Sequence, residues 1–425
     1  MNYTKAVEWV HSLGRLAPAA GLARMRQLME LLGNPQQSLA YVHVAGTNGK
    51  GSMVTMLSSI LAKAGYRVGA NISPYVLNFR ERFMVNGQMI TEEEFAAVAT
   101  QVKAAAEALK QPILEFEAVT AAAFLYFKQQ NCHIVCLETG LGGRMESTNI
   151  VENTLVACIA RIGLDHMELL GNTIEQIAAE KCGIMKPGCT VVSYPAQQPA
   201  AARQIQKAAR QMGCPLVVPA VQALQELPGG PFQNNVRYKS LSLQIPFAGR
   251  HQALNAMVVA EAAFALEEKG VSISNEAIEE GIGAARFPAR IEIIGKNPLV
   301  ILDGAHNADS AEVLAGTLAA QGVWGLTAVM GVLKDKQPLE MLRLLAPHVA
   351  RLYTVRPNHP RALAAGELAR LAHPLVPQAA AGGSLAEVLA EAKQNGVGEG
   401  LLVCGSLYLA SEARPLLQQL FAPEP

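Results

Sequence analysis

The sequence predicts an α/β protein built on mainly parallel sheets, and three observations support this class. Strand-like apolar runs alternate with helical patterns along almost all of the 425 residues, which is the order that parallel sheets with helices on both faces require. Half of the residues are apolar and 16% are charged, so the chain can bury large cores. A chain of this length exceeds one core, and we therefore expect two or three domains.

The expected strands are spread over the whole chain, with helices between them. They are expected at residues 39–45, 66–72, 133–138, 154–160, 189–193, 299–302, 326–331, 350–355 and 400–404. The clearest helix starts at Thr91, because Glu94 stands in the capping-box position and an Ala-rich run follows. Asn86-Gly87 between two short apolar runs predicts a β-hairpin.

A domain boundary is expected near residues 287–297. The helical pattern stops there, and a strand, a loop and a helix start again at LVILDGAHN. We expect a first domain at 1–288, a linker at about 289–296 and a smaller α/β domain at 297–425. The last part, about 130 residues, is a usual size for one α/β domain.

Composition and charge exclude several classes of partner. Lys and Arg number 35, as do Asp and Glu, and no basic run indicates nucleic acid or an acidic membrane surface. No uninterrupted apolar stretch of about 18 residues predicts a membrane span. The seven cysteines are scattered through apolar stretches, which is typical of reduced core residues. We therefore expect a cytoplasmic monomer whose partners are small molecules.

The stretch HVAGTNGKGS at 43–52 predicts a phosphate-binding loop. A β-branched run ends there in glycines around Lys50, and a helical pattern starts at Met53. Glycines let backbone N–H groups turn toward an anion, while the helix N-terminus and the lysine add positive charge. The loop departs from the G-x-x-x-x-G-K-[ST] pattern, because Val44 replaces the first glycine and Gly51 replaces the hydroxyl residue.

Two polar residues follow neighbouring strand-like runs. Ser73 ends the strand after the phosphate loop, and Glu138 leaves an apolar strand directly into the glycine-rich ETGLGGRMESTN. Ligands bind at the carboxyl ends of strands in α/β sheets, and a carboxylate there suits a hard cation beside phosphates. A turn serine and a solvated loop acid remain the alternatives.

The stretch LDHMELLGNTIEQIAAEKCGIMKPG predicts a helix with Lys181 in its last turn. We expect Asn172 to cap the helix with Glu175 three positions on, and Gly183 to end it. A last-turn lysine can simply offset the helix dipole, which contributes a fraction of a kcal/mol. Alone, neither this lysine nor His166 in the preceding loop indicates a function.

Four stretches nearer the C-terminus carry further polar residues. Asn255 lies in the first turns of a long helix, where a buried amide needs a partner, either the backbone or a ligand such as a purine edge. Arg290 in FPARIE suits a phosphate or a carboxylate. DGAHN and CGS again place polar residues directly after apolar strands. Because polar residues repeatedly follow strand ends, we favour a shared cleft over a set of separate turns.

Ten ordered motifs together resemble those of the folylpolyglutamate synthases, some of which are also dihydrofolate synthases, within the Mur ligase superfamily. The motifs are GTNGKGS (46–52), SP (73–74), ETGLGGRMESTN (138–149), LDH (164–166), EKCGIMK (180–186), GRHQALNA (249–256), FPARIE (287–292), DGAHN (303–307), GVLKDK (331–336) and CGS (404–406). The resemblance covers essentially the whole chain. It implies a P-loop nucleotide-binding domain with a mainly parallel sheet, followed by a smaller Rossmann-like glutamate-ligase domain.

The activity that the resemblance implies is that of an ATP-dependent acid–amino-acid ligase. ATP would phosphorylate the γ-carboxylate of a folate to an acyl phosphate, and the amine of L-glutamate would displace the phosphate to form an amide. Conversion of dihydropteroate to dihydrofolate would be a second activity. Glu146 stands where bifunctional relatives usually have Asp, so the sequence leaves that second activity open.

The resemblance also implies roles for individual residues. ATP would be bound by Gly49, Lys50, Gly51, Ser52, Asn255, Arg290 and Asp303. Of two Mg²⁺ ions, one would be bound by Ser73 and Glu138, the other by His166 and Lys181, the lysine being carbamylated by carbon dioxide. The folate side would use PAAGLARM (18–25), Glu115, Phe116, Glu117 and Glu146, and L-glutamate would contact His306 and Ser406.

Two other functions compete with this one. A peptidoglycan-type amino-acid ligase of the same superfamily would carry an additional N-terminal domain, whereas about 45 residues precede the phosphate loop here. A non-catalytic P-loop nucleotide switch would leave the magnesium and lysine motifs unexplained. ATP turnover that requires both a folate and glutamate separates a folate ligase from a switch.

Overall fold

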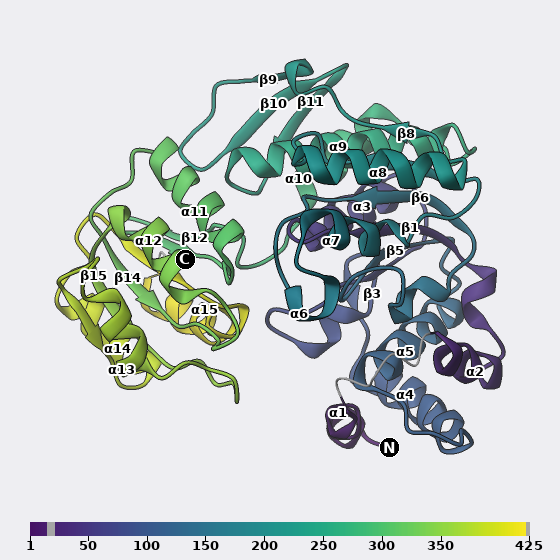
Figure 1. Cartoon of the computed structure of the whole chain (residues 1–425), viewed down its shortest axis with the longest axis horizontal. Coiled ribbons are helices and arrows are strands. Elements are labelled where there is room, and N and C mark those ends of the chain that lie inside the picture. The colour runs from purple at the N-terminus through teal and green to yellow at the C-terminus, as the bar shows by residue number, and fades with distance from the viewer. Residues whose placement is uncertain (15–21, 422–425) are drawn as a thin grey trace. The chain divides into compact units, whose positions relative to one another are not determined.

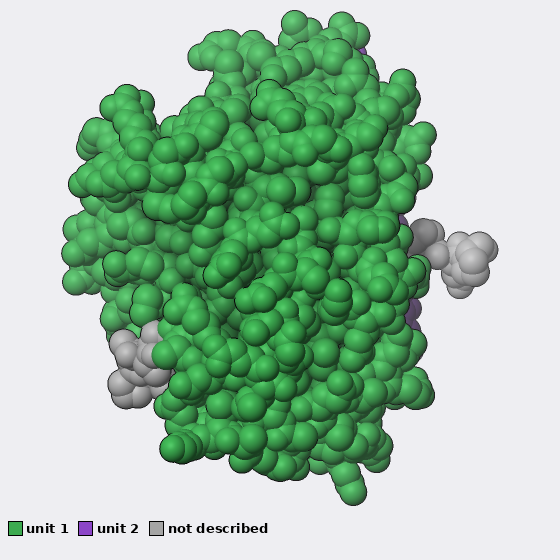
Figure 2. Space-filling view, turned by 90° about the vertical axis from the view of Figure 1, so that its right-hand side faces the viewer, with its two compact units in different colours: residues 1–225, 236–244, 254–286 green, residues 226–235, 245–253, 287–425 purple. Residues whose placement is uncertain are grey.

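The structure, a computed structural model, describes residues 1–14 and 22–421. The chain divides into two compact units, which Figure 2 colours separately. The first contains residues 1–225, 236–244 and 254–286, and the second contains 226–235, 245–253 and 287–425. Each unit has its own largely parallel sheet, so the α/β class expected from the sequence is confirmed.

An eight-stranded sheet forms the centre of the first unit (Figure 1), with the strand order β4-β3-β2-β5-β1-β6-β7-β8. Its strands are β1 (Ala40–Ala45), β2 (Val68–Asn71), β3 (Met84–Val85), β4 (Gln88–Met89), β5 (Ile134–Glu138), β6 (Thr154–Ile159), β7 (Thr190–Ser193) and β8 (Leu216–Val217). β2, β5, β1, β6, β7 and β8 pair in parallel in that order. β3 and β4 add an antiparallel edge next to β2. All five strands expected in this part of the chain are confirmed.

Helices pack against this sheet and form two cores with it. They are α1 (Tyr3–Ser12), α2 (Ala23–Leu31), α3 (Lys50–Lys63), α4 (Glu92–Glu107), α5 (Glu115–Gln129), α6 (Met167–Leu170), α7 (Ile174–Cys182), α8 (Pro199–Met212), α9 (Arg250–Glu267) and α10 (Asn275–Ala284). One core joins α1, α2, α4 and α5 to β1 and β5. The other joins α7 and α8 to β6 and β7.

Local sequence signals explain two of these elements. Asn86 and Gly87 connect β3 to β4 with φ angles of 48° and 76°, and two positive φ angles are what a type I′ hairpin turn requires. The Thr91 hydroxyl accepts a hydrogen bond from the Glu94 N–H, and the Glu94 carboxylate accepts one from the Thr91 N–H. Both the expected hairpin and the expected capping box are confirmed.

The expected start of α7 is wrong by one residue. Thr173, not Asn172, is the N-cap, and Gln176 rather than Glu175 closes the capping box. The Gln176 side-chain oxygen accepts the N–H groups of both Asn172 and Thr173, at 2.8 and 3.3 Å. A neutral amide can therefore complete the cap, and the threonine hydroxyl bonds the Gln176 N–H in return.

A six-stranded sheet forms the centre of the second unit, with the order β12-β13-β17-β14-β15-β16. Its strands are β12 (Glu292–Lys296), β13 (Leu299–Leu302), β14 (Leu326–Met330), β15 (Val349–Thr354), β16 (Ala379–Ala381) and β17 (Leu401–Cys404). Its helices are α11 (Ala308–Ala320), α12 (Pro338–Leu345), α13 (Ala365–Ala372), α14 (Leu385–Gln394) and α15 (Leu407–Phe421). The four expected strands are confirmed, and β12 is the antiparallel edge.

Several short strands are not predicted by the sequence pattern. A separate three-stranded sheet contains β9 (Leu224–Glu226), β10 (Asn234–Tyr238) and β11 (Leu241–Ile245). The edge strands β8, β12 and β16 are also missed. Edge strands are short and partly polar, so their hydrophobic signal is weak.

No helix among the described residues is long and apolar enough to span a membrane. All seven cysteines are buried and none forms a disulfide. Burial raises the pKa of the Cys132 thiol to about 11 and that of Cys182 to about 12. Protonated thiols are poor nucleophiles, so these two cysteines are structural.

Two glycines in α10 allow a stability test. A Cβ on Gly281 would lie 2.6 Å from the backbone nitrogen of Ile60 in α3, whereas a Cβ on Gly283 would have the Gln244 carbonyl oxygen at 3.6 Å as its nearest neighbour. We expect Gly281→Ala to lower the free energy of unfolding by about 1–3 kcal/mol through overpacking. Gly283→Ala should be neutral or stabilise by up to about 1 kcal/mol. Urea unfolding of both variants measures this, and equal effects would contradict close packing of α3 on α10.

Candidate active site

Four loops meet at one edge of the first unit's sheet. They follow β2, β5, β1 and β6, which are parallel neighbours in that order. The carboxyl ends of parallel strands lie at the same edge, where α/β sheets bind ligands. This edge therefore brings together Ser73, Glu138, the phosphate loop and the loop that carries His166.

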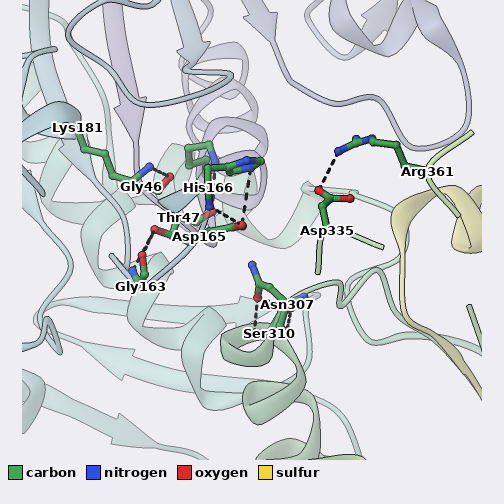
Figure 3. A network of polar contacts seen from close by, with 11 residues as sticks. Gly46, Thr47, Gly163, Asp165, His166, Lys181, Asn307, Ser310, Asp335 and Arg361 are labelled. Carbon is green, nitrogen blue, oxygen red and sulfur yellow. Dashed lines mark hydrogen bonds and ion pairs between the residues drawn. The ribbon is translucent and has the colours of Figure 1, made fainter. Parts of the chain in front are cut away.

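Hydrogen bonds fix the phosphate loop to the loop after β6 (Figure 3). The Thr47 N–H donates to the Arg161 carbonyl at 2.8 Å. The Thr47 hydroxyl donates to the Gly163 carbonyl and accepts from the Gly163 N–H, both at 3.0 Å. Thr47 is a residue that the sequence analysis missed, because a loop hydroxyl has no distinctive spacing.

The phosphate loop leads directly into the N-terminus of α3, where backbone N–H groups can bind a phosphate. Gly49 is the N-cap with a φ of 92°, a conformation that favours glycine. A Cβ on this glycine would lie 3.0 Å from the side-chain amide of Asn255, which is itself 2% exposed. Asn255 therefore packs against the phosphate loop, while Gly51 and Ser52 are buried in the first turn of α3.

Lys50 and Glu138 form the charged centre of this edge. The lysine Nζ lies 3.8 Å from the Glu138 Oε1 and donates to the Thr47 carbonyl at 3.3 Å. The Glu138 Oε2 accepts the Ser73 N–H at 3.0 Å, and the glutamate is 4% exposed. Ser73 and Glu138 are thus adjacent, as expected for two residues that share a ligand.

Lys181 is buried, not a surface lysine at a helix end. It is 4% exposed, and its Nζ donates to the Gly46 carbonyl at 2.7 Å (Figure 3). Burial, with a smaller contribution from the nearby Lys50 charge, lowers the pKa of Lys181 to about 7, and Asp165 opposes this shift. A large fraction of the amine is therefore neutral near pH 7. The dipole-offsetting interpretation does not account for this position.

His166 lies in the loop after β6 and is exposed. It adopts a left-handed φ of 51° and is the N-cap residue of the short helix α6. Its backbone N–H donates to the Asp165 carboxylate at 2.9 Å, and its Nε2 lies 3.9 Å from the same oxygen. Asp165 thus orients His166 while its charge reaches Lys181.

The donors at this edge are of a kind that binds magnesium. The described residues contain no cluster of three or more His, Cys, Asp or Glu side chains that holds a metal alone. The Glu138 carboxylate and the Ser73 hydroxyl are oxygen ligands, and Mg²⁺ is usually bound by one or two carboxylates together with phosphates and water. This donor set fits a Mg²⁺–nucleotide complex better than a metal held by protein alone.

The residues expected on the folate side lie near the start of α5, and the PAAGLARM segment lies partly outside the described residues. Glu117 receives two hydrogen bonds from Arg24, at 3.0 and 2.8 Å, and accepts the Leu114 N–H. Glu115 lies 3.3 Å from His11. Phe116 packs on the loop after β5. The contacts of Glu115 and Glu117 therefore stabilise the N-terminal end of α5.

Glu146 is 6% exposed and faces the protein interior. Its carboxylate accepts the N–H groups of Gly140 and Thr148, at 3.3 and 3.1 Å, and the Thr148 hydroxyl. Burial raises the pKa of Glu146 to about 7, although these hydrogen bonds and Lys50 oppose the shift. Glu146 thus braces the loop in which the resemblance places a folate contact.

In the second unit, one expected ATP contact, Arg290, lies in a strained segment, and a second, Asp303, hydrogen-bonds to that segment. Ala289 and Ile291 have left-handed φ angles of 55° and 49°, which costs a β-branched residue about 1–3 kcal/mol. The buried Asp303 carboxylate compensates by accepting the Ile291 and Ala305 N–H groups, both at 2.8 Å. Arg290, between the strained residues, lies over the Phe287 ring at 4.9 Å.

The expected glutamate contacts lie at the carboxyl ends of β13 and β17. His306 Nδ1 donates to the Gly304 carbonyl at 2.9 Å. Ser406 is 1% exposed, and its hydroxyl accepts the Leu409 N–H at 3.0 Å, so it caps α15. At the neighbouring strand β14, Asp335 pairs with Arg361 at 2.8 Å (Figure 3).

Comparison with known proteins identifies the family. The Mur ligase middle-domain model matches residues 44–263, and the Mur ligase glutamate-ligase-domain model matches residues 289–407. A Bacillus subtilis dihydrofolate synthase/folylpolyglutamate synthase is 39% identical over 384 residues, 86% of this chain and 88% of the relative. A Lacticaseibacillus casei folylpolyglutamate synthase is 32% identical, covering 98% of this chain and 99% of the relative.

A solved structure agrees with the sequence comparison. The Escherichia coli FolC protein in complex with DHPP and ADP superimposes with a TM-score of 0.86 at 29% identity, covering 99% of this chain and 98% of that one. The two family models together cover the phosphate loop, Glu138, Lys181, Arg290 and Ser406. The chain therefore belongs to the Mur ligase family of ATP-dependent ligases, among the folylpolyglutamate and dihydrofolate synthases.

Proposed function

We propose that this chain adds L-glutamate to the γ-carboxylate of folates, with ATP as cosubstrate. The arrangement of Lys50, Glu138 and Ser73 at one sheet edge carries the proposal, because it combines a phosphate loop with a buried oxygen donor set. The ADP and DHPP in the related E. coli structure support the two substrate classes. The proposal places the P-loop domain at residues 1–288 and the glutamate-ligase domain at 297–425, joined by a linker at about 289–296.

The reaction requires activation of a carboxylate. A γ-carboxylate oxygen of the folate attacks the γ-phosphorus of ATP, the bond to ADP breaks, and an acyl phosphate forms. The neutral amine of glutamate then attacks the acyl carbon, phosphate leaves, and the amide nitrogen loses a proton. Lys50 opposes the charge that develops on the transferred phosphoryl group, and the loops position the reactants.

The proposal includes two Mg²⁺ ions. Ser73 and Glu138 would hold the first together with the ATP phosphates, and His166 and carbamylated Lys181 would hold the second. Bound Mg²⁺ supplies charge neutralisation at the phosphates. Carbamylation would join the neutral Lys181 Nζ to the carbon of CO₂ and release one proton, so that a neutral amine becomes an anionic oxygen ligand.

The remaining ATP contacts and the substrate contacts are assigned by residue. ATP would also contact Gly49, Gly51, Ser52, Asn255, Arg290 and Asp303. The folate would contact the loop of Glu146 and the start of α5 at Glu115, Phe116 and Glu117, and glutamate would contact His306 and Ser406. The proposed protein is a cytoplasmic monomer, and its buried, unpaired thiols support a reducing compartment.

One assay tests the function. Purified protein is incubated with ATP, Mg²⁺ and L-glutamate, and with tetrahydrofolate or dihydropteroate in separate reactions, and ADP release and product mass are measured. We expect ADP release that requires both glutamate and a pterin substrate. ATP turnover that is independent of both would contradict a ligase and favour a nucleotide switch.

Glu146→Asp tests substrate preference. We expect the wild type to act mainly on folates, and the aspartate variant to raise the ratio of dihydropteroate to folate turnover by about threefold, or ~0.6 kcal/mol. The reason is that loss of one methylene moves the carboxylate relative to Gly140 and Thr148. Equal turnover of the two substrates by the wild type, unchanged in the variant, would refute this expectation.

A further inference from the structure

A buried row of polar side chains links the phosphate-loop strand β1 to Glu146. It consists of His43 in β1, Thr148 and Glu146, all in the first unit, and the proposed function assigns no role to His43 or Thr148. His43 Nε2 lies 2.9 Å from the Thr148 hydroxyl oxygen, and that hydroxyl also contacts the Glu146 carboxylate. His43 and Thr148 are both 0% exposed. Burial of three adjoining polar groups lowers the stability of the fold unless each of them forms hydrogen bonds.

The hydrogen positions in this row follow from the number of available protons. Burial, assisted by the charge of Lys186, lowers the pKa of His43 to about 3, so the ring is neutral. When Glu146 is ionised, its carboxylate accepts the single hydroxyl proton of Thr148, and the Thr148 oxygen then accepts the His43 Nε2 proton. This leaves His43 Nδ1 as a buried ring nitrogen without a partner among the described residues. An apolar ring would fill the same space without that cost, so packing alone does not explain the histidine.

The row connects two parts of the active site. At one end, His43 lies in β1, three residues before Gly46, the first glycine of the phosphate loop. At the other end, Glu146 Oε1 accepts the Gly140 N–H at 3.3 Å, and Gly140 lies two residues after Glu138. A Cβ on Gly140 would lie 2.7 Å from the Phe116 ring, so this turn packs directly against α5. The Glu146 carboxylate therefore holds in place the turn at Gly140, which follows Glu138 and packs against Phe116.

We infer that His43 and Thr148 are positioning residues that hold the Glu146 carboxylate, and through it the Gly140 turn, in the orientation that selects between dihydropteroate and folates. The inference rests on the proposed function. Neither residue touches substrate in this scheme, and each acts only through Glu146. With both of its oxygens bonded, the carboxylate has one defined position, whereas loss of the Thr148 hydroxyl removes the bond that ties it to β1.

Thr148→Val and Thr148→Ser are a matched pair that tests this. Valine keeps the volume of threonine and removes the hydroxyl, while serine keeps the hydroxyl. For each variant, kcat and KM are measured with dihydropteroate and with tetrahydrofolate. We expect valine to change the ratio of the two kcat/KM values by at least about fivefold, in the direction of Glu146→Asp, and serine to stay within about twofold of wild type. His43→Phe, which removes the ring donor, should move the ratio as valine does.

A double variant separates action through Glu146 from a general structural role. Residues that act through one partner have non-additive effects. In a Glu146→Gln background, Thr148→Val should therefore leave the substrate ratio unchanged. An equal shift in both backgrounds would overturn the inference, and so would an unchanged ratio in active valine and His43→Phe proteins with lowered melting temperatures. A wild type that turns over neither substrate would instead refute the proposed function, and the inference with it.

Discussion

Replacement of Lys50 by alanine is expected to abolish ligation and to leave the fold nearly intact. The lysine starts α3, and its Nζ lies near the Thr47 carbonyl and the Glu138 carboxylate rather than in an apolar core. In the proposed function its charge opposes the negative charge on the transferred phosphoryl group, so its loss would remove stabilisation of the transition state. We expect the rate of glutamate addition to fall below a tenth of wild type, a loss of more than about 1.4 kcal/mol.

Lys63→Ala, at the other end of α3, is the matched control. Lys63 is paired with Glu280 at 3.2 Å on the exposed surface, and such a pair contributes about 0–1 kcal/mol to stability. The control should keep wild-type activity, and both variants should keep their melting temperature to within a few degrees. A Lys50→Ala protein that retains more than a tenth of the wild-type rate would show that the phosphate-loop assignment is incorrect.

The sequence predicts the buried strands of this fold and the β3–β4 hairpin, but not the edge strands β8, β12 and β16. Central parallel strands such as β1 and β5 are buried on both faces, so their residues are mostly apolar, with His43 the one exception within β1 and Glu138 at the end of β5. The edge strand β16 contains three alanines and is partly exposed, and alanine carries no preference for strands. The one-residue error at Thr173 has a different cause. Asn172 and Thr173 are both residue types that cap helices, and the hydrogen bonds decide between them.

The sequence names candidate site residues but does not show the surroundings of each side chain. Phosphate-loop spacing identifies Lys50 because the chemistry depends on local sequence. Sequence spacing does not distinguish a buried Lys181 from an exposed one, since its burial comes from Gly46 in a distant segment. The strain at Ile291 was also invisible, because a β-branched residue is the least expected occupant of a left-handed conformation.

Lys181→Ala is expected to lose most ligase activity at nearly unchanged stability. A dipole-offsetting lysine would be dispensable, with an effect of a fraction of a kcal/mol on stability and none on turnover. The observed lysine is buried and donates to the Gly46 carbonyl of the phosphate loop, and burial lowers its pKa to about 7. A buried amine that becomes a carbamate supplies two anionic oxygens beside the nucleotide, and alanine supplies none.

Acetate rescue distinguishes loss of a ligand from loss of packing. In Lys181→Ala, a short carboxylic acid can occupy the vacated space and provide the missing oxygens, so added acetate should restore part of the activity. Lys181→Met is the matched control, because its side chain fills that space without an amine; it should be equally inactive, and acetate should not rescue it. Rates are measured against acetate concentration, with chloride at the same ionic strength as reference.

Two results together would exclude the carbamate at Lys181. One is a fully active Lys181→Ala variant, which a magnesium ligand does not permit. The other is a high-resolution map of the magnesium–nucleotide complex in which Lys181 is unmodified and still bonded to the Gly46 carbonyl. Rescue of the alanine variant by acetate, with no rescue of the methionine variant, would instead show that activity needs an anionic oxygen at this position. Both variants lack the amine that bonds to Gly46, and they differ only in the space that they leave for acetate.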